Sequence, residues 1–377
     1  MNKVYLDNSG STKVLDEVRD TFNVVVDNYY ANCSAVHNLG NENSLLFKEA
    51  RKQVASLCAV REDEIFFTSG TTESINTAIK GSVLYNMHRK NHVVTTTLEH
   101  SSVISTLKYL EKRFNIEVTY VKPENGKITA KMITDSVKEN TVLVTMVHVQ
   151  SETGNILPIN EVAEYLKNKE TLLHIDACQS FGKLPINLNE FDMVSVSFHK
   201  LHGIKGSGML FKKHSVLIDS LIHGGNQQEY RSGTLPLELC VCGAKCVRIA
   251  FENMNDNYSK VEKNYKSLYE YFDGKSDVFI NSAEAGSPYI LNISILNIHI
   301  AAFSRMMWEK GFYFSTKTSC SSGASYSEVI YDLTNDKALA TNSIRISIGK
   351  YNTVEEIRTF IQVFDECLEK VRGNNCG

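Results

Sequence analysis

The segment VSVSFHKLHGIKGSG, residues 194–208, decides how this sequence is interpreted. It begins as a strand, because valines alternate with small polar residues, and a histidine and Lys200 follow directly. A glycine-rich turn then closes the segment. The pattern predicts one lysine held at the end of a rigid strand, beside backbone N–H groups that can bind an anion.

Lys200 is therefore a candidate for a covalent bond to a cofactor. A desolvated lysine amine forms Schiff bases, and pyridoxal 5′-phosphate (PLP) is bound through such a lysine. An ordinary surface lysine before a turn is the alternative. The cofactor interpretation needs a phosphate site, a carboxylate for the ring nitrogen and a group that stacks on the ring.

A phosphate site is predicted at TSGTTES, residues 68–74. The motif follows the apolar run 65–67 and precedes a helical stretch at 75–84. Hydroxyl and N–H groups at a helix N-terminus bind phosphate. Taken alone, the motif is better explained as a helix start capped by serine or threonine.

The carboxylate for the ring nitrogen and the group that stacks on the ring also have candidates that follow predicted strands. Asp176 in HIDACQS (174–180) can keep a pyridinium nitrogen protonated, and Gln179 can donate to the phenolic oxygen of the ring. His100 in EHSS (99–102) can stack on the ring and move a proton. A helix-capping aspartate and a solvated loop histidine are the ordinary alternatives.

The order of apolar runs predicts an α/β fold with a large and a small domain. Runs rich in Val, Ile and Thr alternate with helical stretches, which indicates a mostly parallel, seven-stranded sheet. We expect a large PLP-binding domain at 13–252 and a small α+β domain formed by 1–12 and 253–377. The seven runs are 65–67, 92–95, 118–121, 142–146, 172–175, 193–196 and 209–211.

Composition limits the classes of partner. The 377 residues carry a net charge of −3, so no general attraction to nucleic acid or acidic lipid is expected. No apolar stretch approaches the roughly 20 residues that span a bilayer. An acidic residue, Asp7, precedes any apolar run at the N-terminus, so no signal peptide is expected. The predicted location is cytoplasmic.

The cysteines predict neither a disulfide scaffold nor a metal site. Their number, nine, is odd and their spacing is irregular. Cys240, Cys242 and Cys246 lie close together, but no fourth ligand lies nearby. We interpret their segment as the packed face of a helix.

These motifs resemble those of cysteine desulfurases, PLP enzymes of fold type I in the class V aminotransferase superfamily, and the group I branch in particular. The similarity runs from YLDNSGST (5–12) to SIRISIG (343–349), and RSGTLP (231–236) is the most specific motif besides the lysine segment. The resemblance implies conversion of L-cysteine to L-alanine with transfer of sulfur to an acceptor protein, for iron–sulfur cluster or thio-nucleoside biosynthesis. It also implies a homodimer.

The resemblance also assigns roles in the cofactor site. It implies that His100 stacks on the ring, that Asp176 pairs with its nitrogen and that Gln179 bonds its phenolic oxygen. Ser151 is a further cofactor-binding candidate, at a position where the family usually carries Asn. The phosphate would be held by Thr71, Thr72, Ser197 and His199, and by Thr234 of the partner subunit.

For the substrate, the resemblance implies that Arg345 clamps its carboxylate, with Asn32 nearby. Cys320 would accept the sulfur as a persulfide. Its segment STKTSCSSGAS (315–325) is small and polar, which is typical of a mobile loop with an exposed, reactive thiol. Either Lys200 or His100 would move the proton of Cα.

Two segments depart from the family pattern. HGGNQQEYR (223–231) is one residue shorter than usual, and ANCS (31–34) replaces Gly-Asn-Pro-Ser. They motivate one alternative function, a PLP-binding scaffold that relays sulfur only with a partner. A selenocysteine lyase or another class V PLP enzyme also stays open.

Overall fold

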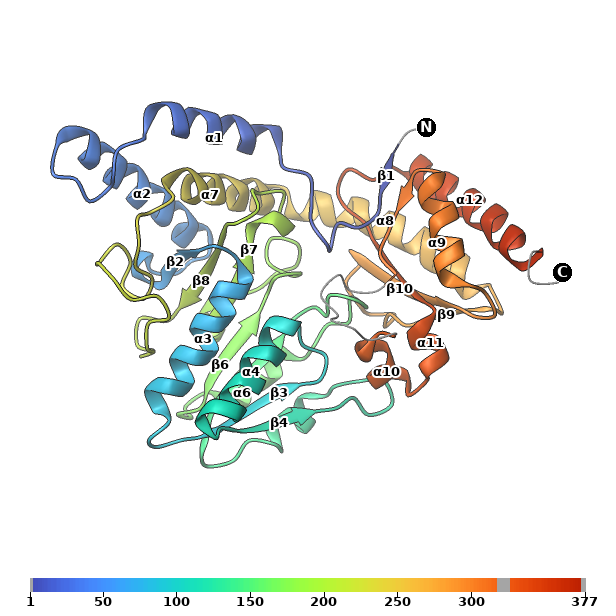
Figure 1. Ribbon diagram of the computed structural model, residues 1–377, viewed down its shortest axis with the longest axis horizontal. Coiled ribbons are helices and arrows are strands. Elements are labelled where there is room, and N and C mark those ends of the chain that lie inside the picture. Colours follow the sequence, from blue (N-terminus) through green and yellow to red (C-terminus); the bar gives the residue numbers. More distant parts are fainter. Residues whose placement is uncertain (1–2, 317–325, 374–377) are drawn as a thin grey trace.

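A computed structural model describes residues 3–316 and 326–373 (Figure 1). The larger part is built on a seven-stranded sheet in the order β2-β8-β7-β6-β5-β3-β4. Strand β8 runs antiparallel to both neighbours, and the other pairs are parallel. All seven predicted runs are strands of this sheet. Their bounds are β2 Ile65–Thr68, β3 His92–Thr96, β4 Glu117–Val121, β5 Thr141–Val147, β6 Leu172–Asp176, β7 Met193–Ser197 and β8 Gly208–Lys212.

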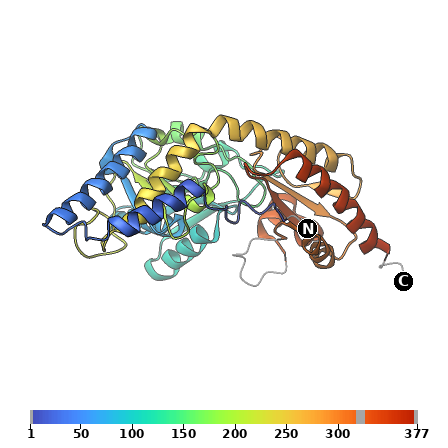
Figure 2. The same cartoon turned by 90° about the horizontal axis from the view of Figure 1, so that it is seen from above.

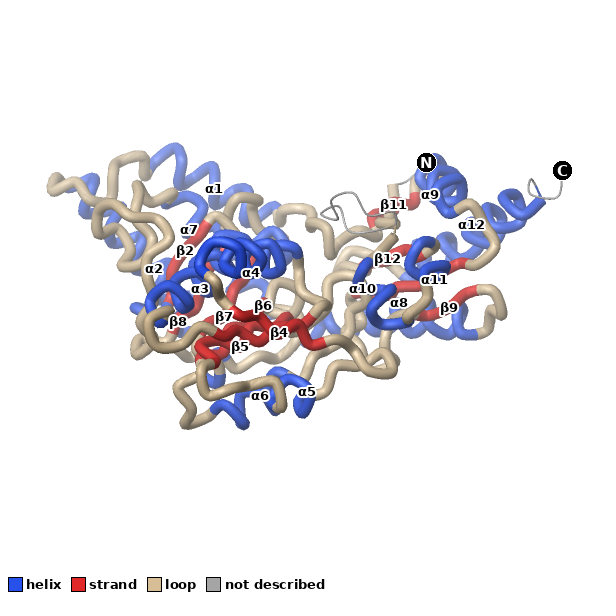
Figure 3. Tube along the Cα trace, turned by 60° about the horizontal axis from the view of Figure 1, so that its bottom comes forward, coloured by secondary structure: helices blue, strands red, loops and turns tan. Residues whose placement is uncertain are grey.

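Helices cover both faces of the sheet, as Figure 3 shows. Consecutive strand residues point to opposite faces, so Phe66 and Val93 pack in one core and Phe67 and Val94 in another. Burial on both faces explains why the strands are apolar throughout rather than alternating. The first core is covered by α3 (Thr71–Asn86) and α4 (Ser101–Phe114), and the second by α1 (Asp16–Asn28), α2 (Asn38–Leu57), α6 (Ile159–Leu166) and α7 (Leu237–Glu252).

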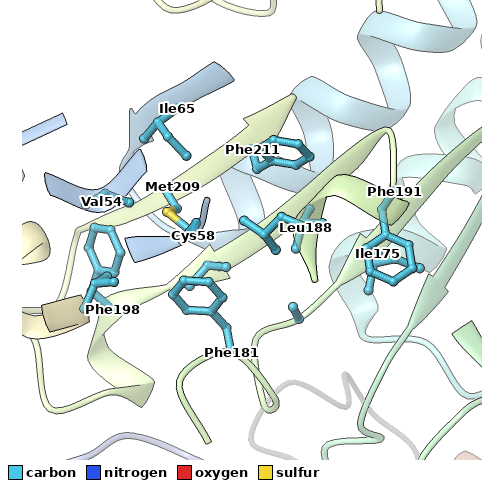
Figure 4. Packing of buried hydrophobic residues seen from close by; sticks show 14 of the residues in the cluster. Val54, Cys58, Ile65, Ile175, Phe181, Leu188, Phe191, Phe198, Met209 and Phe211 are labelled. Carbon is cyan, nitrogen blue, oxygen red and sulfur yellow. The ribbon is translucent and has the colours of Figure 1, made fainter. Parts of the chain in front are cut away.

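The second core fixes the chain on either side of Lys200. Figure 4 shows Phe198, Phe181 and Met209 packed beside strands β7 and β8. A Cβ atom on Gly243 of α7 would lie 2.3 Å from the Phe198 ring, so only glycine fits there. The three clustered cysteines of α7 are buried on this helix, as the packed-face interpretation predicts.

A second part of the molecule has its own core and lies beside the first along the long axis (Figure 2). Its sheet has the order β12-β10-β9, with antiparallel pairs. The N-terminal β1 pairs in parallel with β11 and packs in this core. These separate cores support the domain bounds predicted above, which remain a prediction. The strands are β1 Val4–Tyr5, β9 Val278–Ile280, β10 Ile290–Ile295, β11 Phe312–Tyr313 and β12 Ser343–Ser347.

Helices surround the smaller sheet, and α8 leads into it from α7 (Figure 1). Among the residues that the structure describes, no helix combines the length and the hydrophobicity needed to cross a membrane. The remaining helices are α5 Ala130–Thr134, α8 Met254–Asp273, α9 Ile300–Glu309, α10 Glu328–Thr334, α11 Lys337–Thr341 and α12 Val354–Gly373.

Strand β2 lies at the edge of the large sheet, and a side chain occupies part of its open edge. The amide of Gln228 accepts a hydrogen bond from Phe67 N at 2.8 Å and donates one to Phe67 O at 2.9 Å. The Gln228 amide thus pairs with the strand as another strand residue would. This contact fixes the loop before α7 to the sheet.

Candidate active site

A pocket of about 430 Å³ opens at the carboxyl ends of the strands, where ligands bind in sheets of this kind. Both parts of the molecule line it: Ser9 and Arg345 come from the smaller part, and Asp176 and Lys200 from the larger one. His100, Thr71, Thr72, Ser151, Gln179, Ser197 and His199 line it too. The structure therefore brings together most of the residues singled out in the sequence.

Lys200 follows β7 in a short helical turn, Phe198–Lys200. Its ammonium donates hydrogen bonds to the backbone oxygens of Ser9 and Gly10, the latter at 2.6 Å. Burial lowers the pKa of Lys200. A lysine that loses its proton more readily is better suited to act as a nucleophile and as a base.

Asp176 ends β6 and is buried. One of its oxygens accepts a hydrogen bond from Cys178 N at 2.9 Å. Burial raises the pKa of Asp176, because the pocket offers its charge little solvation. A cationic ring nitrogen would provide the missing counter-charge, so this carboxylate suits a pyridinium partner.

His100 caps the N-terminus of α4 at the mouth of the pocket. Its Nδ1 accepts from Ser102 N at 3.2 Å and lies 2.8 Å from Ser102 Oγ. Burial lowers the pKa of His100, which favours the neutral imidazole. A flat, neutral ring held by its helix cap is well placed to stack on a cofactor.

The phosphate motif forms a cradle at the start of α3. Gly70 has φ 140°, and a Cβ atom on Gly208 would lie 2.6 Å from Gly70 Cα, so both glycines are needed for the close approach. Thr71 Oγ1 is buried and has no hydrogen-bond partner within the described part of the chain. A phosphate oxygen would satisfy it.

Two further phosphate candidates, Ser197 and His199, line the same pocket as Thr71 and Thr72. Ser197 ends β7 and is buried, and His199 follows it in the turn. Burial lowers the pKa of His199 to about 4, so its imidazole is neutral. The cradle, the orphaned hydroxyl and Asp176 together fit PLP: Thr71, Thr72, Ser197 and His199 would hold its phosphate.

Glu73 is a pocket residue that the sequence did not point to. It lies in the first turn of α3 and accepts hydrogen bonds from Ser69 N at 2.9 Å and from Arg231 Nε at 3.0 Å. Burial opposes its charge, but these partners outweigh burial and lower the pKa of Glu73. The ion pair joins the loop of RSGTLP to the phosphate cradle.

Arg345 enters the pocket from β12 and is 5% exposed. Its Nη2 donates to Asp7 Oδ1 at 2.8 Å, and its Nη1 donates to Ser151 O at 3.1 Å. Its Nε is buried without a partner among the described residues. The guanidinium is therefore fixed, yet it retains donor capacity for a carboxylate. Nothing in the sequence around Asp7 indicated this pairing.

Two predicted site residues that the structure describes, Thr234 and Asn32, do not line the pocket in the single chain. Thr234 and Asn32 are exposed, and Asn32 Oδ1 accepts from Ser34 N at 2.9 Å. Cys320 lies outside the described residues. The roles of all three remain predictions.

Comparisons with known proteins agree with this arrangement. The family model described as aminotransferase class-V matches residues 4–360. Cysteine desulfurase IscS of Buchnera aphidicola subsp. Acyrthosiphon pisum (strain 5A) is 34% identical over 380 residues, which cover 98% of this chain and 93% of that protein. A solved structure described as a NifS-like protein aligns with a TM-score of 0.91 at 34% identity and covers 98% of this chain and 100% of its own. SspA in complex with cysteine aligns at 0.82 and 29% identity, over 93% of this chain and 100% of its own.

Proposed function

Since this chain belongs to the cysteine desulfurase family of class V aminotransferases, which are PLP enzymes of fold type I, we propose that it desulfurates L-cysteine. The products are L-alanine and a persulfide that passes its sulfur to an acceptor protein. One observation carries the proposal: a single pocket combines the buried amine of Lys200, the buried carboxylate of Asp176 and the guanidinium of Arg345.

Each of these groups has a distinct task. Bound PLP supplies an electron sink that weakens the bonds at the Cα and Cβ of the amino acid. Asp176 stabilises the positive charge of the ring nitrogen, and His100 covers one face of the ring. The amine of Lys200 holds the cofactor and then takes the proton from Cα, which its lowered pKa favours.

Substrate recognition depends on the carboxylate of the amino acid. Arg345 binds this carboxylate, and Asp7 and Ser151 O hold the guanidinium in place. The thiolate of Cys320 then forms a bond with the sulfur of L-cysteine. The C–S bond breaks, the carbon takes up a proton, and the net result is L-alanine and a Cys320 persulfide.

The functional unit is a homodimer in this proposal. Thr234 is exposed in the loop that leads into α7, where a partner subunit's cofactor phosphate can meet it. Large apolar side chains are exposed on α1, α2 and the segment between them, as expected of a surface that a second copy covers. They are Val24, Val26, Tyr30, Val36, Leu39 and Leu45.

The free state of the cysteines fits a reducing compartment, and we place the protein in the cytoplasm. The seven described cysteines are all free, and four of them lie buried in α2, α7 or their immediate ends. The acceptor of the sulfur is a protein of iron–sulfur cluster assembly or of thio-nucleoside synthesis in this proposal.

The test is the formation of alanine from L-cysteine by the purified holoenzyme with a thiol reductant present. We expect alanine and sulfide in equal amounts, and neither from the Lys200→Ala variant. Selenocysteine as the sole active substrate would instead identify a lyase for that amino acid. Turnover that appears only after addition of an acceptor protein would identify a partner-dependent sulfur relay.

A further inference from the structure

Lys183 is a buried lysine behind the pocket that the proposed reaction does not use. It is 8% exposed, and its ammonium lies 5.5 Å from the centre of the Tyr289 ring. Its Nζ donates a hydrogen bond to Gln179 Oε1 at 3.2 Å. Gln179 and Lys183 are four positions apart in a helical turn after β6. In this turn Phe181 N and Leu184 N donate to carbonyls four residues back. The side chains of Gln179 and Lys183 therefore lie on the same side of the turn.

The surroundings of Gln179 fix the orientation of its amide. An ammonium can only donate, so the amide oxygen must face Lys183. On the other side, Gln179 Nε2 donates to Ser9 O at 2.9 Å, and a carbonyl can only accept. Gln179 lines the pocket, so the second hydrogen of this amide nitrogen is the donor that the side chain can offer to a ligand there.

We propose that Lys183 is a positioning residue for the cofactor, because it holds the Gln179 amide with its N–H side toward the phenolic oxygen of bound PLP. The inference rests on the proposed function for the identity of the cofactor. Of the two contacts that orient the amide, only that of Lys183 comes from a side chain. A substitution can therefore remove this contact.

The energetics of Lys183 argue against a purely structural role. Burial, with a smaller contribution from the nearby Lys200, lowers the pKa of Lys183 to about 8. Even with the Tyr289 ring beside it, a buried cation with one hydrogen bond from its side chain among the described residues is less favourable than a methionine of similar length in the same space. A side chain retained at this cost is expected to serve Gln179 or the pocket.

The test is the absorption spectrum of the resting holoenzyme without substrate, so it does not depend on desulfuration. Hydrogen bonds to the phenolic oxygen favour its ionised form over the neutral form, which absorbs at shorter wavelength. We expect Lys183→Met to lower the ratio of the ionised band to the neutral band about fivefold, as for the loss of one hydrogen bond. Lys183→Arg, which still donates, should retain most of the wild-type ratio.

A double-mutant cycle shows whether Lys183 acts through Gln179. Gln179→Leu should shift the ratio in the same direction, and Lys183→Met should add nothing in that background. A shift of equal size in the Gln179→Leu background would mean that the charge acts on Lys200 directly and would overturn the proposal. An unchanged ratio in Lys183→Met would overturn it as well.

The matched control is Lys212→Met. Lys212 is equally buried, but its ammonium donates to the backbone oxygens of Lys213 and Val216. It does not line the pocket. This variant should leave the band ratio unchanged, and circular dichroism of all variants checks that they are folded.

Discussion

Arg345 and Asp7 form an ion pair of 2.8 Å between segments that lie 338 residues apart in the chain. The pair joins the segment after β1 to strand β12 at the pocket. The guanidinium is thus ordered before any substrate arrives. The entropy cost of fixing this side chain therefore does not reduce the free energy of substrate binding. In the proposed function, an incoming carboxylate shares this guanidinium with Asp7.

Arg345→Lys should raise the KM for L-cysteine by about 10- to 100-fold, with a smaller effect on kcat. An ammonium cannot bind a carboxylate through two parallel N–H groups or bond Asp7 and Ser151 O at the same time. Steady-state kinetics of alanine formation measure the change. The exposed Arg305 on α9 provides the control, because Arg305→Lys should leave KM unchanged. An unaltered KM in Arg345→Lys would exclude this arginine as the carboxylate site.

Cys320→Ser should reduce sulfur transfer by at least about 10³-fold and leave the PLP spectrum unchanged. A hydroxyl cannot replace the thiolate as the sulfur acceptor. Alanine formation and persulfide labelling provide the two measurements. Cys376→Ser in the C-terminal tail is the control and should behave as the wild type. Full activity in Cys320→Ser would refute the assignment.

Thr234 should act on the cofactor of the other subunit. Thr234→Ala is expected to weaken PLP binding by about tenfold, as for the loss of one charge-assisted hydrogen bond. Mixing Lys200→Ala subunits with Thr234→Ala subunits creates dimers with one complete site. Activity of the mixture above that of either variant alone would establish the contact in trans, and no gain despite exchange of subunits would contradict it.

Glu99 should make the enzyme less stable as the pH rises. Burial, with a contribution from Asp176, raises the pKa of Glu99 to about 8, whereas its ordinary value is 4.5. The unfolded chain therefore releases this proton at lower pH than the folded one, so stability falls between about pH 4.5 and pH 8.

Glu99→Gln removes this titration. It should equal the wild type near pH 5 and be more stable by about 1–3 kcal/mol near pH 8. Urea unfolding of the holoenzyme at a series of pH values, at one protein concentration, measures the difference. If the difference in unfolding free energy between Glu99→Gln and the wild type does not grow with pH, Glu99 is ionised in the folded protein.

The seven strands of the sheet and the positions of Lys200 and Asp176 were predictable because they depend on local patterns. An apolar run indicates a buried strand, and a polar residue at its end lies at the pocket edge. The start of α2 at Asn38 does not follow from an apolar pattern. The His37 side chain caps it by accepting a hydrogen bond from Gly40 N at 3.2 Å, and a Cβ atom on Gly40 would lie 2.3 Å from Ala35 O, so the turn before the helix requires glycine there.

The pairs that support the site could not be predicted in the same way. Asp7 with Arg345 and Glu73 with Arg231 join residues far apart in sequence, and only the folded chain brings them together. Lys183 is close to Gln179 in sequence, but a lysine in a turn gives no sign that it will be buried. The proposed role of Thr234 depends on a second subunit, so a single chain cannot reveal it.

The amide of Gln228 on strand β2 has a consequence for the behaviour of the protein in solution. Exposed edge strands present free N–H and C=O groups on which another chain can add a strand, and this is a common route to aggregation. Gln228 already bonds the N–H and the C=O of Phe67, so the short strand β2 has little free edge on which a strand of another chain can add. The contact that anchors the loop therefore also protects the concentrated protein from association through its sheet edge.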